Sequence, residues 1–256
     1  MTVHQIYEMI DVYAPFSSKM EDDNSGLLVG SASQEVDSVL FALDLTDPVI
    51  DEAVSLGAGL IVTHHPVMFQ PVHALVDSDY EARLIQRLVR ENISMIAAHT
   101  NLDQASGGVN DALADCCALT NISGNGFFRY GLLDRPCTAR EYALQLENSL
   151  NTVVRLMGPE NKVIRRIGVC SGAGSSEWLD ALDTCCDAFV SGEIKHHHAL
   201  AITGSGLVAF ECGHFATEEP GVRALASALQ KRINTLQSNM RIYVSELSAY
   251  CFSKQP

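Results

Sequence analysis

The chain has 256 residues, which is long enough to bury a full hydrophobic core as one large domain or as two smaller ones. Hydrophobic residues make up 47% of the chain and charged residues 19%, a composition typical of a folded globular protein. The formal net charge of −14 argues against a broad surface for the phosphate backbone of nucleic acids.

The N-terminal sequence, the lengths of the apolar runs and the cysteine pattern all predict a cytoplasmic protein. No apolar run approaches the ~20 residues that span a bilayer, and residues 1–7 lack the basic and apolar pattern of a secretion signal. We therefore expect a cytoplasmic protein without membrane association. The eight cysteines form no CxxC pair, which is typical of reduced thiols. Three of them are expected to be small core residues: Cys137, Cys170 and Cys251.

Strands and helices are predicted to alternate along the whole chain. In the first half, we expect strands over 36–43, 59–62 and 93–98 and helices over 48–56, 79–91 and 109–119. A turn-rich connection follows around Gly124 and Gly131. In the second half, we expect helices over 139–150, 177–185, 199–202 and 217–236 and strands over 153–156, 164–170, 188–190, 207–210 and 241–246. This alternation predicts α/β layers with parallel or mixed sheets.

The first motif, Thr63-His64-His65-Pro66, ends the apolar run 59–62. Open α/β sheets place ligand chemistry where their strands end. Successive residues of an extended chain face opposite sides, so His64 and His65 can each bind a different metal ion. The alternative is a polar loop that happens to contain two histidines.

Three further segments repeat this arrangement, and together the four segments contain every histidine except His4 and His73. They are 96–103 with His99 and Asp103, 191–198 with Glu193 and three histidines, and 210–221 with His214 and Glu218. Imidazole and carboxylate groups are the ligand set for zinc, iron, manganese or nickel. Because the segments come from both halves of the chain, we expect a metal site where the halves meet.

Two other features of the second half have alternative interpretations. Cys212 lies two residues before His214, so it is either a thiolate ligand or a core residue. The segment 171–176, Ser-Gly-Ala-Gly-Ser-Ser, follows a predicted strand and precedes a predicted helix. It is either a tight turn that needs glycine or a cradle of backbone amides for an anion.

Taken together, the motifs resemble a known family. Thr63-His64-His65-Pro66, the segment 99–103, Ser191-Gly192-Glu193 with its three histidines, and the segment 213–218 are similar to the dinuclear metal-centre family related to the yeast NGG-interacting factor. Members of this family are often called GTP cyclohydrolase type 2 homologues. The segment 23–30, Asp-Asn-Ser-Gly-Leu-Leu-Val-Gly, also resembles the family's N-terminal motif, although Asp22 stands where many relatives carry tryptophan. The resemblance spans nearly the whole chain and indicates the short form of the family.

The resemblance implies a fold of two similar α/β lobes with mixed sheets flanked by helices, and a metal site between the lobes. We expect an N-terminal lobe over 1–125, with 205–256 packing on it, and a second lobe over 126–204. It also implies a homohexamer with two divalent metal ions per subunit, iron, zinc, manganese or nickel. The ligands carried over from the family are His64, His65, Asp103, His214 and Glu218.

Local sequence signals refine the expectation for the last two ligands. Thr217 resembles a helix N-cap and Pro220 then falls in the first turn, so His214 is expected to precede the helix. Glu218 is expected to bridge two ions with its two oxygens, and Glu219 to face solvent.

Glu193 and His99 are the candidate catalytic residues, placed to orient ligands or to shuttle protons. For His99 the alternative is a core histidine bonded to a backbone carbonyl.

The first functional hypothesis is a metal-dependent hydrolase of a nucleotide or a phosphorylated small molecule, and the family's name suggests GTP cyclohydrolase chemistry. The alternative is a non-catalytic metal-handling or regulatory protein. The expected partners are other copies of the chain and a small-molecule substrate.

Overall fold

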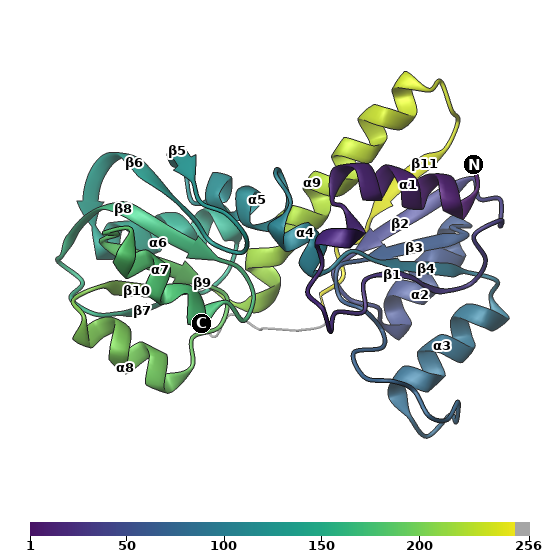
Figure 1. Cartoon of the computed structure of the whole chain (residues 1–256), viewed down its shortest axis with the longest axis horizontal. Helices are drawn as coiled ribbons and strands as arrows, with labels where there is room; N and C mark the ends of the chain where they lie inside the picture. The colour runs from purple at the N-terminus through teal and green to yellow at the C-terminus, as the bar shows by residue number, and fades with distance from the viewer. Residues whose placement is uncertain (249–256) are drawn as a thin grey trace. The chain divides into compact units, whose positions relative to one another are not determined.

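The computed structural model describes residues 1–248, which form two α/β units, each with its own mixed sheet (Figure 1). The first unit contains residues 1–106 and the described residues from 222 onward, and the second contains 107–221. The expected boundaries at 125 and 205 were therefore misplaced: residues 107–125 and 205–221 belong to the second unit. Cys251 lies outside the described residues.

The first unit is built on a five-stranded sheet. Its strands, in spatial order, are β1 (Gly26–Val29), β4 (Ser94–Ala97), β3 (Leu60–Thr63), β2 (Ser38–Ala42) and β11 (Arg241–Val244). Only β1 is antiparallel to its neighbour. The helices of this unit are α1 (Val3–Tyr13), α2 (Asp47–Leu56), α3 (Tyr80–Arg90), α4 (Thr100–Gln104) and the end of α9 (His214–Thr235), with a 3₁₀ turn at Phe16–Ser18.

Local sequence explains these elements. Every residue of β2, β3 and β4 is buried, as expected for apolar runs in a parallel sheet covered on both faces. Helix α2 begins after Thr46, whose side chain accepts from the amide of Val49, and ends before Gly57, whose φ of +64° caps it. Helix α3 begins after Asp79 in the same way and buries Ala82, Leu84, Ile85 and Leu88.

The register of the parallel strands positions the chemistry. Ala42 pairs with Thr63, and Thr63 pairs with Ala97, so β2, β3 and β4 end side by side. The residues that follow these three strands therefore gather at one edge of the sheet.

The second unit is built on a six-stranded sheet. In spatial order its strands are β5 (Leu119–Ser123), β6 (Arg129–Thr138), β8 (Val163–Cys170), β9 (Ala188–Ser191), β10 (Val208–Glu211) and β7 (Arg155–Met157). Strands β8, β9 and β10 are parallel, and the other neighbours are antiparallel. Its helices are α5 (Val109–Cys116), α6 (Ala139–Leu150), α7 (Trp178–Asp183), α8 (His196–Gly204) and the start of α9, with a 3₁₀ turn at Ser175–Glu177.

The prediction of a turn-rich connection is wrong at Gly131, because this residue lies within the ten-residue strand β6. A Cβ atom at Gly131 would come 2.8 Å from the carbonyl oxygen of Thr120 on β5, so glycine permits the close pairing of the two strands. Strand β5 was also missed, because four of its five residues are exposed and show no apolar alternation.

Two of the cysteines that were expected in the core can be placed. Cys170 is buried in the core of the second unit and Cys137 is partly buried. Among residues 1–248, no helix combines the length and the apolar character that crossing a membrane requires.

Candidate metal centre

His64 follows β3 and is buried, with 1% of its surface exposed. Its backbone amide donates to the carbonyl of Ala42, and its Nδ1 lies 2.8 Å from the carbonyl oxygen of Ala98. A carbonyl oxygen can only accept, so Nδ1 holds a proton and, in the neutral ring, the lone pair lies on Nε2. This tautomer is the one in which Nε2 can coordinate a metal ion.

His65 is oriented by a carboxylate. Its Nδ1 lies 2.7 Å from Oδ1 of Asp44, which follows β2 at the same edge of the sheet. The hydroxyl of Thr63 donates to the carbonyl oxygen of His65 at 2.7 Å and holds the backbone at this point. Sequence reasoning missed Asp44, although a carboxylate just after a predicted strand is the same signal that identified Asp103.

His99 follows β4 and immediately precedes α4. Its Nδ1 lies 2.7 Å from Oδ1 of Asp23, so its partner is a carboxylate and not the backbone carbonyl of the alternative interpretation. Burial raises the pKa of Asp23, but hydrogen bonds from His99, Ser25 and Thr100 outweigh it and hold this pKa well below its usual range. Asp23 is therefore a carboxylate at neutral pH.

These three imidazoles form one cluster in the first unit. The ring centroid of His64 lies 5.0 Å from that of His65 and 5.1 Å from that of His99. The three histidines offer nitrogen atoms within 4.8 Å of one another, which is close enough to share a metal ion. Asp103 lies in α4 and is also buried, and its Oδ1 is 3.5 Å from Nε2 of His64.

The second unit brings His214 and Glu218 together. The Nε2 of His214 lies 3.0 Å from Oε2 of Glu218, and its Nδ1 lies 2.8 Å from Oε1 of Glu193. The expectation that His214 precedes the helix is wrong: α9 begins at His214, after Gly213 with φ +84°. His214 and Glu218 therefore share one helical face at the i, i+4 spacing.

The glycine segment 171–176 supports this pair directly. Gly172 has φ +54°, and a Cβ atom there would come 1.9 Å from Oε1 of Glu218 and 3.1 Å from Nε2 of His214. Its amide donates to the hydroxyl of Thr217, which lies inside α9 and is not the N-cap that was expected. Glycine is needed here because the loop backbone approaches the Glu218 carboxylate closely.

The remaining candidates of the second unit have other surroundings. Burial raises the pKa of Cys212 well above its ordinary value, so this thiol stays protonated and is a core residue. His196 and His197 are exposed at the start of α8, and Nδ1 of His198 lies 2.9 Å from the hydroxyl oxygen of Ser175. Glu219 is partly buried rather than facing solvent.

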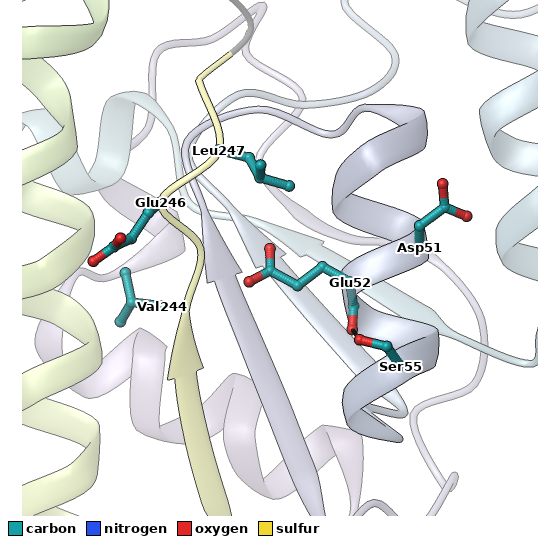
Figure 2. A pocket seen from close by; sticks show the side chains of 6 residues that line it. All are labelled: Asp51, Glu52, Ser55, Val244, Glu246 and Leu247. Atoms are coloured by element: carbon teal, nitrogen blue, oxygen red, sulfur yellow. Dashed lines mark hydrogen bonds between the residues drawn. The ribbon is translucent and has the colours of Figure 1, made fainter.

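A cleft of about 610 Å³ in the first unit has a different lining. Its walls are formed by Asp51, Glu52, Ser55, Val244, Glu246 and Leu247 (Figure 2). Figure 2 shows that the hydroxyl of Ser55 donates a hydrogen bond to the carbonyl oxygen of Glu52 within α2. None of the candidate ligands lines this cleft.

Comparison with known proteins identifies the family. The family model described as Duf34/NIF3 (NGG1p interacting factor 3) matches residues 1–250. The chain belongs to the NIF3 family. This confirms the resemblance inferred from the motifs.

Individual NIF3 relatives match over nearly their full length. A protein of Clostridium perfringens named GTP cyclohydrolase 1 type 2 homolog is 30% identical over 245 residues, which cover 92% of this chain and 94% of the relative. A protein of the same name from Clostridium acetobutylicum is 28% identical, with 96% of both chains covered. The crystal structure of a Staphylococcus aureus protein matches with a TM-score of 0.94 and 27% identity, covering 100% of this chain and 99% of the other. The predicted α/β fold with two mixed sheets is thereby confirmed.

Proposed function

We propose that this NIF3-family chain is a metal-dependent hydrolase of a nucleotide or a phosphorylated small molecule. It would hold two divalent ions with ligands from both units: His64, His65, Asp103, His214 and Glu218. The proposal requires the two groups of ligands to meet in the working protein.

The main support for the proposal is a hydrogen-bonding arrangement that four histidines have in common. Each directs Nδ1 to an oxygen acceptor at 2.7–2.8 Å, as described above for His64, His65, His99 and His214. Metal-binding histidines almost always donate the second ring N–H to a carboxylate or a backbone carbonyl in this way. Histidines scattered on a surface would not share this arrangement.

The donor set also fits the proposed ions. Imidazole nitrogens and carboxylate oxygens suit zinc, iron, manganese or nickel, whereas closed structural sites are usually rich in cysteine. Glu218 is buried beside His214, and Gly172 provides the space in which its carboxylate lies. Glu218 would supply its carboxylate oxygens to the ions.

In the proposed hydrolysis, bound ions and side chains of the protein would have different roles. When bound, two ions lower the pKa of a coordinated water and stabilise the attacking and leaving atoms of a displacement. Glu193 fixes the ring of His214 through Nδ1 and so holds Nε2 in place. Asp23 keeps the proton of His99 on Nδ1, so that His99 can accept or return a proton at Nε2.

A turnover screen tests this function. Protein loaded with zinc, manganese, iron or nickel is assayed against nucleotides and phosphoesters. Hydrolysis should stop in chelator and return when metal is added. His64→Ala and Asp103→Ala should each abolish it, whereas His73→Ala, an exposed histidine outside the four segments, should leave it nearly unchanged.

Two results would contradict the hydrolase function. Turnover that persists in Asp103→Ala would place the activity elsewhere. Readily exchanged metal, without turnover above that of the Asp103→Ala protein, would favour a metal-handling or regulatory role instead.

We also propose that the chain assembles as a homohexamer, as its family resemblance implies. Light scattering at micromolar protein should give about six times the mass of one chain, and a mass near 27.8 kDa would refute the assembly.

A further inference from the structure

An aromatic side chain lies directly beside the imidazole cluster of the first unit. The ring centroid of Phe69 is 5.6 Å from that of His99, with the two rings perpendicular. It is 6.3 Å from the centroid of His65, with the rings tilted by 45°. Phe69 thus contacts two of the three histidines of the cluster.

Phe69 is not part of the hydrophobic core. Its neighbours Val67, Met68 and Val72 pack into the core of the first unit. Phe69 is absent from that packing, and 53% of its surface is exposed. Aromatic side chains gain stability when they are covered, so the accessible part of the Phe69 ring offers an apolar surface beside the histidines that a ligand can cover.

The backbone that carries Phe69 is fixed by the same segment that fixes His99. The side-chain amide of Asn24 donates to the carbonyl oxygen of Met68 at 2.7 Å. The adjacent Asp23 accepts from Nδ1 of His99. One dipeptide therefore holds both the histidine and the residue before Phe69, which keeps the two rings in a constant relation.

We propose that Phe69 stacks on a planar heteroaromatic ring of the substrate. The inference rests on the proposed function, because it assumes that the substrate binds at the imidazole cluster. It narrows the substrate class to nucleotides and related compounds that carry such a ring, and it excludes plain sugar phosphates. Stacking is tolerant of base identity, because every base offers a π-face, so the ring type is specified and the particular base is not.

A matched pair of probes tests the proposal by binding rather than by turnover. Guanosine monophosphate and ribose 5-phosphate share the sugar and the phosphate and differ by the base. Calorimetry on metal-loaded protein should give about tenfold tighter binding of the nucleotide, which is the contribution expected of one stacked base. Phe69→Ala should remove this preference, and Phe69→Tyr, which keeps the ring, should retain it.

Controls separate stacking from damage to the site. Leu75→Ala removes an equally exposed apolar side chain of the same segment and should leave the preference unchanged. Metal content should be equal in all these variants, because Phe69 offers no ligand atom.

A spectroscopic variant reports the contact directly. Trp178 is the single tryptophan of the chain, so Phe69→Trp combined with Trp178→Phe places the only indole beside the histidines. Guanosine monophosphate should quench its fluorescence and ribose 5-phosphate should not.

The proposal and the hydrolase function fail in different ways. Equal affinity of the unmodified protein for both probes, binding of neither probe, or an unchanged preference in Phe69→Ala would each overturn the stacking role. Ring-dependent binding without turnover would support stacking and would instead contradict the hydrolase function.

Discussion

Three carboxylates and one backbone carbonyl orient the four histidines of the candidate metal centre. The carboxylates are Asp23, Asp44 and Glu193, and each accepts from an Nδ1 atom. A carboxylate partner fixes both the tautomer and the orientation of the imidazole ring. In the proposed function, this arrangement directs Nε2 of His64, His65 and His214 to the ions and leaves Nε2 of His99 to exchange a proton.

The sequence predicts the candidate histidines better than it predicts the residues that orient them. His64 and His99 end apolar runs, and that pattern is visible along the chain. Asp23 lies 76 positions from His99, and Asp44 lies 21 positions from His65, so only the fold reveals these pairs. Glu193 is the exception, since its proximity to three histidines marked it, and its catalytic role stays a prediction.

Glu193→Ala should weaken metal affinity about 10- to 100-fold, because His214 loses the acceptor that fixes its ring. Glu193→Gln should retain most of the affinity, since the amide oxygen still accepts from Nδ1. Competition with a chromophoric chelator measures both constants. Identical affinities for the unmodified protein and both variants would show that Glu193 does not position a ligand.

Among the elements, the segment 171–176 and helix α9 carry and support the candidate ligands of the second unit, His214 and Glu218. The loop amide of Gly172 bonds to Thr217 inside the helix, and Gly172 leaves room for Glu218. Helix α9 was expected to start at Thr217 because a Thr followed by a Pro resembles a helix start. It starts three residues earlier, and Pro220 is accommodated inside the helix.

Gly172→Ala should lower metal content strongly, because the added methyl would displace the Glu218 carboxylate. Gly126→Ala is the matched control: its φ of +56° is almost the same, but nothing lies within 4 Å of a Cβ atom there. Both variants should lose roughly 1–2 kcal/mol of unfolding free energy from the left-handed backbone. Elemental analysis should separate them, and equal metal content would refute the role given to this loop.

Burial of a cysteine thiol in the second unit should make the protein less stable at alkaline pH. Burial raises the pKa of Cys117 to about 12, whereas the thiol ionises near ~8.5 in an unfolded chain. Above ~8.5 the unfolded chain therefore binds fewer protons than the folded one. The free energy of unfolding should be unaffected below that pH and should fall as pH rises toward 12, by up to about 1.4 kcal/mol per pH unit.

Denaturant titrations between pH 7.5 and 10.5, followed by the fluorescence of Trp178 in the same unit, measure this slope. Cys117→Ala should flatten it, because one titrating group is removed. An equally steep slope in the variant would mean that other groups cause the loss.

For the whole molecule, the alternation of strands and helices predicted the α/β fold correctly, and the unit boundaries could not be placed. The apolar runs of β2, β3 and β4 made the first sheet visible in the sequence. Strand β5 is mostly exposed, so the sequence offered no apolar pattern there to assign residues 107–125 to the second sheet. The candidate ligands divide in the same way: His64, His65 and Asp103 belong to the first unit, and His214 and Glu218 to the second.

The metal content per chain is the measurement that decides whether these five ligands together hold two ions. Elemental analysis of the full chain purified without chelator should give about two equivalents of iron, zinc, manganese or nickel. Glu218→Gln should reduce this to below one equivalent, and Glu219→Gln should leave it nearly unchanged. Metal at background level in the unmodified protein, or equal losses in the two variants, would show that these residues do not form a two-ion site.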